Sequence, residues 1–271
     1  MPPPQPPVGG YSSIMPITTQ HGHALLHVTH DRVGASAVRS MGTADLRTGS
    51  VPVVLVPGLG APGYLLRTLE RCARSGPARL LDVPGYRDPA GPVCGETLGA
   101  LADTVARWLA DVPGGPVVLA GHSTGAQVAL HAAARSPGRV RALVLMAPTF
   151  PPPLRRTAPL SVAAFRTAVQ ESPGVVPAVL PSYLAAGPRR LLTCARSAQA
   201  DAPEAVLPHV TCPVTVLGAE DDALSPPGWV RHLAGRAARG RAVVVRGAHA
   251  FPHRHPDVTA EVLNGARRTS F

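Results

Sequence analysis

Short, largely apolar runs, each followed by turn residues, recur along most of the chain. They occupy residues 51–56, 79–82, 117–120, 140–147, 213–217 and 242–246. Runs of this length and composition are typical of strands that are buried on both faces, as in a parallel sheet. Helical patterns lie between them, at residues 64–74, 96–111, 126–135, 228–239 and 256–268. This alternation predicts an α/β fold, with a mostly parallel central sheet and helices on both of its faces.

The pattern differs at two places, and these differences predict how the chain is divided. Residues 1–20 are rich in proline and predict a loose leader, after which 23–30 and 35–39 alternate apolar and polar side chains and predict two short antiparallel strands. Residues 151–209 contain proline clusters, several short helical patterns and no strand-like run. We therefore predict a core formed by 1–150 and 210–271, interrupted by a helical lid at 151–209.

The apolar run at 117–120 leads directly into the pattern Gly-x-Ser-x-Gly at 121–125, with Ser123 at its centre. The pattern alone is common, but a buried strand before it and a helix after it make it specific. A serine on such a sharp corner presents its hydroxyl above the sheet, and the flanking glycines let neighbouring backbone approach. The alternative is that Ser123 only caps the helix that follows.

Polar residues follow two later predicted strands. Asp221 and Asp222 come after the run at 213–217, and His249 comes after the run at 242–246. A glycine-rich loop at 57–63 follows the run at 51–56. Because parallel strands end at the same edge of a sheet, we expect these segments to lie close to Ser123.

Together these motifs resemble the α/β-hydrolase family, whose catalytic residues follow the chain order Ser, Asp or Glu, His. The resemblance runs from about residue 24 to residue 268. It implies that Ser123 is the nucleophile, that His249 is the general base and that an aspartate orients the base. Asp222 fits the family better because it stands four residues before Pro226, whereas Asp221 remains the alternative because it stands three residues after Gly218.

The resemblance also implies an oxyanion hole formed by two backbone N–H groups, those of Leu59 and Thr124. Relatives often have His-Gly where this chain has Pro57-Gly58, a difference that changes the support of the loop and leaves the main-chain donor in place. We expect His122 to pack beneath the turn. We expect His253 and His255 to be loop side chains rather than the base.

These residues predict a serine hydrolase that cleaves a carboxylic ester, thioester or lactone of a small molecule through an acyl-enzyme. Two alternatives remain open. The same scaffold can serve a C–C bond hydrolase or a nonhydrolytic cyclase or coupling enzyme of secondary metabolism, or it can be a catalytically silent ligand-binding protein. Serine at position 123 argues against epoxide hydrolases and haloalkane dehalogenases, which use aspartate there.

Composition narrows the range of partners. The formal charge is +10 and every one of the 26 basic residues is arginine, but the arginines are scattered rather than gathered into a stripe. Scatter argues against a nucleic-acid partner, although it leaves room for an acidic or carrier-linked substrate. The sequence does not indicate an oligomeric state.

Motifs for cofactors, metals and membranes are not found in the sequence. The four cysteines are widely spaced without a C-x-x-C pair, and no dinucleotide or phosphate loop is present, so we expect no cofactor, no metal and no disulfide framework. No apolar run reaches about eighteen residues, and the first residues lack the basic and apolar regions of a signal peptide. We therefore expect a cytoplasmic protein with no membrane partner.

Overall fold

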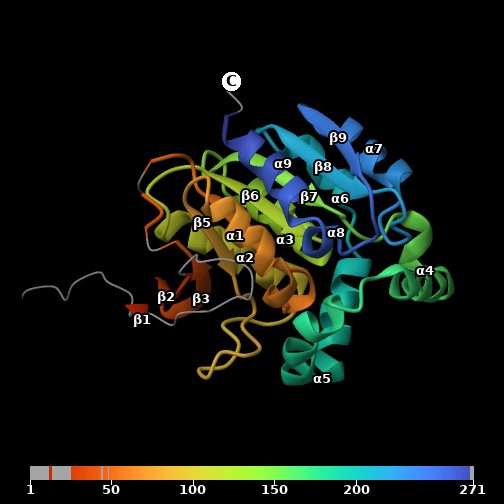
Figure 1. Ribbon diagram of the computed structural model, residues 1–271, viewed down its shortest axis with the longest axis horizontal. Helices are drawn as coiled ribbons and strands as arrows, with labels where there is room; N and C mark the ends of the chain where they lie inside the picture. The colour runs from red at the N-terminus through yellow and green to blue at the C-terminus, as the bar shows by residue number, and fades with distance from the viewer. Residues whose placement is uncertain (1–11, 14–25, 44, 48, 269–271) are drawn as a thin grey trace, which may run out of the picture.

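The computed structural model describes residues 12–13, 26–43, 45–47 and 49–268, so nearly all of the predicted leader at 1–20 lies outside the described residues. Within this part of the chain, nine strands form one sheet in the order β1-β2-β3-β5-β4-β6-β7-β8-β9 (Figure 1). The neighbours from β5 to β9 are all parallel, whereas β1, β2 and β3 pair antiparallel. The α/β fold with a mostly parallel sheet is therefore confirmed.

The parallel strands follow the predicted runs closely, and all of them are largely buried on both faces except β9, whose residues are exposed or half-buried because it lies at the edge of the sheet. They are β4 (Val53–Val56), β5 (Ala78–Leu81), β6 (Val117–His122), β7 (Val140–Met146), β8 (Val214–Ala219) and β9 (Gly240–Val245). Every residue of β4, β5, β6 and β8 is buried.

The antiparallel hairpin ends later than its alternation predicts, and residues 23–25 of the first predicted strand lie outside the described residues. β2 spans His27–Val33 and β3 spans Ser36–Gly42, whereas the predicted strands are 23–30 and 35–39. Val33 pairs with Ser36, so the turn is two residues long, and Gly34 adopts a positive φ of 57°. This tight turn fixes the pairing, and β2 therefore extends through the polar residues Asp31 and Arg32. Next to β2 lies β1, at Ser12–Ser13.

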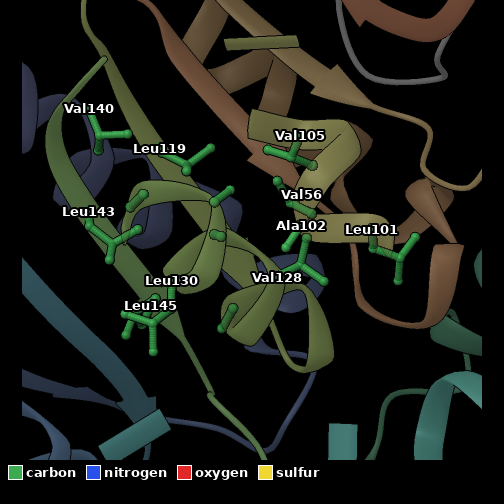
Figure 2. Packing of buried hydrophobic residues seen from close by; sticks show 14 of the residues in the cluster. Val56, Leu101, Ala102, Val105, Leu119, Val128, Leu130, Val140, Leu143 and Leu145 are labelled. Atoms are coloured by element: carbon green, nitrogen blue, oxygen red, sulfur yellow. The ribbon is translucent and has the colours of Figure 1, made fainter. Parts of the chain in front are cut away.

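Side chains alternate between the two faces of the sheet and build two apolar layers. Val54, Val56 and Leu119 face the helices α2 (Leu98–Asp111), α3 (Thr124–Arg135) and α7 (Pro227–Arg236). Figure 2 shows Val56 and Leu119 with Leu101, Val105 and Val128 in this layer. Val53, Leu55 and Val118 face the opposite layer, which includes α1 (Leu66–Ala73) and α9 (Pro256–Arg268). The period of two along each strand thus divides the core into two layers, one on each face of the sheet.

Residues 151–209 contain helical elements and no strand, but two of the helices, of 14 residues and of 25 residues across a bend, are longer than the short helices that the sequence predicts. The elements are η3 (Pro152–Arg155), α4 (Thr157–Gln170), α5 (Val175–Gln199), α6 (Pro203–Val206) and η4 (Leu207–His209). α5 bends at Gly187, whose backbone is not helical, next to Pro188. α4 buries only Ala163 and Thr167, and in Figure 1 it projects with α5 from the layered core. The role of this segment as a lid stays a prediction.

The connections at the carboxyl ends of the strands contain three short helices. They are η1 (Gly58–Gly60) and η2 (Pro62–Leu65) after β4, and α8 (Phe251–Arg254) after β9. No helix among the described residues is long and apolar enough to cross a membrane.

Candidate active site

Ser123 occupies a strained corner between β6 and α3. Its φ of 59° and ψ of −126° lie outside the regions that most residues adopt, and its N–H donates to the Met146 carbonyl at 2.9 Å. A Cβ on Gly121 would come within 2.0 Å of the Gly125 carbonyl oxygen, and one on Gly125 within 2.5 Å of the Pro57 oxygen. Both glycines are therefore required by close packing around the corner. The Ser123 side chain makes no capping hydrogen bond to α3, so the capping alternative is wrong.

A continuous chain of hydrogen bonds joins Ser123 to a buried aspartate. The Ser123 Oγ lies 2.9 Å from the Nε2 of His249, and the Nδ1 of His249 lies 2.8 Å from the Oδ2 of Asp222. The other carboxylate oxygen of Asp222 accepts the N–H groups of Leu224 at 2.8 Å and Ser225 at 2.9 Å. An ionised carboxylate only accepts, so the proton of His249 is on Nδ1 and its Nε2 is free to accept the Ser123 hydroxyl.

The structure separates the two candidate aspartates. Asp222 is only 2% exposed and contacts His249, whereas Asp221 is exposed and its N–H donates to the Gly247 carbonyl at 3.0 Å. The choice between the histidines is equally plain, because His249 alone contacts Ser123. His253 is a buried residue of α8 with its Nδ1 3.2 Å from the Tyr64 carbonyl, so the expectation that it is a loop side chain is wrong.

Charges near the imidazole favour its protonated form. Burial by itself lowers the pKa of His249, but the carboxylates of Asp222 and Glu171 outweigh this effect and leave it raised. Burial works in the opposite direction on Asp222, and His249 together with the two N–H donors leaves the pKa of Asp222 lowered. The pair therefore resembles a carboxylate set to stabilise an imidazolium.

The two expected oxyanion donors lie side by side, but one of them already has an acceptor. The Leu59 N–H donates to the Oγ1 of Thr124 at 2.8 Å, and Leu59 has a positive φ of 46°. Thr124 is the first residue of α3, so the helix provides no acceptor for its own N–H. Gly58 brings the loop against Ser123, because a Cβ there would lie 2.9 Å from the Ser123 Cβ. A substrate oxygen that binds Leu59 must share or replace the Thr124 hydroxyl.

A model of the alpha/beta hydrolase family matches residues 53–262, which include the whole hydrogen-bonded chain from Ser123 to Asp222. The chain belongs to this family. A search of the curated proteins found no match.

Solved structures of the same fold include several hydrolases. A thermophilic esterase from Thermogutta terrifontis is 21% identical with a TM-score of 0.67, over 89% of this chain and 97% of its own. An enol-lactonase from Burkholderia xenovorans LB400 is 15% identical with a TM-score of 0.67, and the match covers 86% of this chain and 97% of the lactonase. An N-formylmaleamic acid deformylase from Pseudomonas putida S16 is 19% identical with a TM-score of 0.62, and the match covers 83% of this chain and 96% of the deformylase. At these identities the likeness shows the fold.

This α/β hydrolase has a second, fully buried set of hydrogen bonds beneath the first. The Gly58 N–H donates to the Tyr64 Oη at 2.8 Å, Tyr64 Oη lies 2.8 Å from the Nδ1 of His122, and the Nε2 of His122 lies 2.9 Å from the His249 carbonyl oxygen. Burial, with the positive charge of nearby His249, lowers the pKa of His122 to about 3. His122 does lie beneath the turn, but nothing in the sequence signals its hydrogen bonds with Tyr64.

Two cavities of the α/β hydrolase adjoin the loops that carry the aspartates and His249. One, of about 600 Å³, lies between α4 and the loop after β8 and is lined by Val162, Arg166, Asp221 and Asp222 among others. The other, of about 320 Å³, is lined by Glu171, Arg246, Ala250 and Arg254 among others. Among the described residues, no group of three His, Cys, Asp or Glu side chains is placed to hold a metal ion.

Proposed function

We propose that the protein is a serine hydrolase that cleaves a carboxylic ester, thioester or lactone of a small molecule through an acyl-enzyme. The observation that carries the proposal is the unbroken chain Ser123–His249–Asp222, with contacts of 2.9 and 2.8 Å. Serine is a weak nucleophile near neutral pH, and a base at hydrogen-bond distance with a buried carboxylate behind it is the arrangement that activates it.

In the first half of the reaction, the Ser123 Oγ attacks the carbonyl carbon while His249 Nε2 takes the hydroxyl proton. Asp222 stabilises the imidazolium that forms. Negative charge develops on the former carbonyl oxygen, and the N–H groups of Thr124 and Leu59 are the donors at the side of Ser123 that can stabilise it. When the tetrahedral intermediate collapses, the bond to the leaving group breaks, and His249 returns the proton to that group.

In the second half, water takes the place of the leaving group. His249 removes a proton from water as its oxygen attacks the acyl carbon, and the Ser123 Oγ leaves with that proton. The products are the carboxylic acid and the alcohol or thiol, and a lactone gives a single hydroxy acid. The helices of 151–209 act in this proposal as a lid that shapes the substrate site, with α4 over the cavity beside Asp222.

Labelling and turnover test the proposal together. The wild-type protein is expected to react with a fluorophosphonate at Ser123 and to hydrolyse p-nitrophenyl esters, and mass spectrometry of a slow ester is expected to show an acylated serine. Ser123→Ala is expected to lower kcat by about 10⁶-fold and to abolish labelling. Retained turnover in purified Ser123→Ala would remove the acyl-enzyme mechanism.

Product analysis separates this proposal from a nonhydrolytic reaction on the same scaffold. Incubation in H₂¹⁸O is expected to place one heavy oxygen in the carboxylic acid, because water attacks the acyl carbon. If Ser123 reacts with the fluorophosphonate but the product contains no ¹⁸O, hydrolysis is contradicted and acyl transfer, cyclisation or coupling is favoured.

A further inference from the structure

We propose that Tyr64 and His122 are positioning residues, which hold the oxyanion loop and the base in one geometry through the buried hydrogen bonds from Gly58 to the His249 carbonyl. We call these three bonds the relay. The proposal rests on the proposed function, because the loop and the base matter in this way only if Ser123 is acylated.

The direction of every bond in the relay follows from its ends. The Gly58 N–H can only donate, so the Tyr64 oxygen accepts it. Tyr64 then has a single proton to give, and it donates this proton to His122 Nδ1. The His249 carbonyl can only accept, so the proton of His122 is on Nε2. The relay therefore requires neutral His122 in one tautomer.

The relay joins the carboxyl ends of three different strands, β4, β6 and β9. Gly58 follows β4 and immediately precedes Leu59, the proposed oxyanion donor. His122 is the last residue of β6 and immediately precedes Ser123. The third end is the backbone of His249 itself, after β9. One set of bonds thus contacts the neighbours of both the donor and the nucleophile, together with the base.

Burial makes these bonds hard to replace. Tyr64 is 4% exposed and His122 is 2% exposed, so water does not readily take the place of a missing partner. The rings also pack, with 5.2 Å between the centroids of Tyr64 and His122 and 4.9 Å between those of His122 and His249. A change that keeps the ring and removes the hydroxyl therefore separates hydrogen bonding from packing.

Tyr64→Phe is that change. It leaves the Gly58 N–H without its acceptor and His122 Nδ1 without its donor, so the loop shifts relative to the base. A misplacement of about 1 Å can cost about 100-fold in rate, and we expect kcat to fall by about 10- to 100-fold while KM changes by less than about threefold. A boronic acid, which forms a tetrahedral adduct with serine, should bind more weakly by a similar factor.

Tyr86→Phe is the matched control. Tyr86 packs against Gly60 of the same loop, where a Cβ would come within 2.6 Å of its ring, and it is only 6% exposed. Its hydroxyl has no hydrogen-bond partner within the described residues. Removing the Tyr86 hydroxyl keeps an aromatic ring against this loop and breaks no hydrogen bond, so it should change kcat by less than about twofold. An equal loss of kcat in both variants would assign the effect to the aromatic packing and overturn the relay.

Substitutions of His122 test the two halves of the relay. The amide of His122→Asn reaches the Nδ1 position and can keep the bond to Tyr64, and that of His122→Gln reaches the Nε2 position and can keep the bond to His249. Each should retain more activity than His122→Ala. The double variant Tyr64→Phe with His122→Ala should lose less kcat than the product of the two single losses, because both changes remove the bond between Tyr64 and His122. Multiplied losses would contradict the relay.

The tautomer of His122 gives a readout that does not depend on turnover. In ¹⁵N-histidine spectra, with the His122→Asn variant used for assignment, we expect protonated Nε2, unprotonated Nδ1 and no titration between about pH 5 and 8. Titration near the ordinary histidine pKa would overturn the relay. Absence of turnover and labelling in the wild type would instead overturn the proposed function, and the spectra would still show whether the hydrogen bonds exist.

Discussion

Single side chains in this site differ in role according to burial rather than residue type. Asp221 and Asp222 are adjacent aspartates on one loop, yet one is exposed and the other is 2% exposed and bonded to His249. Two N–H donors, those of Leu224 and Ser225, and the imidazole together compensate the charge of the buried carboxylate. The pair therefore offers an internal comparison between a positioning carboxylate and a solvated one.

Asp222→Asn and Asp221→Asn are expected to have very different effects. Asparagine at 222 can hold the imidazole in the wrong tautomer, with the proton on Nε2, and kcat should fall by about 10⁴-fold. Asparagine at 221 should change kcat by less than about twofold, because the interaction of that residue with the Gly247 carbonyl uses its backbone N–H. Steady-state kinetics on a p-nitrophenyl ester measures both. Equal losses would contradict the assignment of Asp222.

The pH dependence of activity follows from the direction of the His249 shift. The base must be neutral to take the serine proton, and it is protonated below its pKa. Because neighbouring carboxylates raise that pKa, the acid limb of kcat/KM should have its midpoint above about 6.5, the ordinary histidine value. A profile measured between about pH 5 and 9 checks this. A midpoint well below the ordinary value would contradict a base held between Asp222 and Glu171.

At the scale of elements, the helical segment 151–209 contacts the core next to the base. Glu171 directly follows α4, and its Oε1 accepts the N–H of Ala250 at 2.7 Å, the residue after His249. Burial raises the pKa of Glu171, and the Ala250 N–H partly offsets this. A second link joins Glu96, before α2, to Arg190 on α5 at 3.2 Å. Only the first of these two links lies beside the imidazole.

Glu171→Gln should move the acid limb of kcat/KM to lower pH. Glutamine keeps an oxygen that accepts the Ala250 N–H but removes a negative charge that raises the pKa of His249, so the imidazole stays neutral at lower pH. The shift is read from the same pH profile as that of the wild type.

Glu96→Gln is the control for this shift. It removes a charge from the ion pair that joins the core to Arg190 on α5, and the acid limb of kcat/KM should stay where it is. Equal shifts in both variants would show that loosening of the helical segment, rather than the Glu171 charge, moves the limb.

At the scale of the whole molecule, the four cysteines report how closely the layers pack. Cys72, Cys194 and Cys212 are buried and free, and Cys94 is half-buried. Burial raises the pKa of Cys72 to about 12 and those of Cys194 and Cys212 to about 11. These thiols therefore stay protonated near neutral pH, and the thiolate is the form that reacts.

A thiol reagent such as DTNB, used at about pH 8, should label Cys94 first and the other three only as the protein unfolds. The rate of the slow phase should follow urea concentration, and peptide mass spectrometry identifies the order. Rapid reaction of all four thiols without denaturant would contradict the burial of Cys72 on α1, Cys194 on α5 and Cys212 just before β8.

The sequence predicts the sheet well because each strand is specified locally. The runs at 51–56 and 117–120 are apolar on both faces, so they are stable only as strands that are covered on both sides. Ser123, its glycines and the strand before them likewise form one continuous stretch. The contact between Asp222, after β8, and His249, after β9, could also be predicted, because parallel strands end at the same edge of the sheet.

The parts that the sequence does not reveal are bonds between distant residues. The hydrogen bonds from Tyr64 to His122, from Leu59 to Thr124 and from Ala250 to Glu171 join residues 58, 65 and 79 positions apart. A tyrosine, a threonine and a glutamate carry no local pattern that marks them for such contacts. The burial of His253 is absent from the sequence pattern for the same reason, because it depends on the packing of α8 against Tyr64.

β7 and β8 are adjacent in the sheet although residues 147–213 separate them in the sequence, and this arrangement affects which part of the chain can vary. The chain leaves the sheet after Met146 and returns at Val214, on the adjacent parallel strand, with Met146 paired to Leu217. In a parallel pair the chain leaves at the carboxyl end of one strand and returns at the amino end of the next, so the excursion also has to cross back along the sheet, and Val214 pairs with Leu143. Insertions, deletions or whole exchanges within it leave the pairing of the two strands untouched. Evolution and engineering can therefore vary most of this excursion without disturbing the sheet, provided that the contact of Glu171 with Ala250 beside His249 is kept.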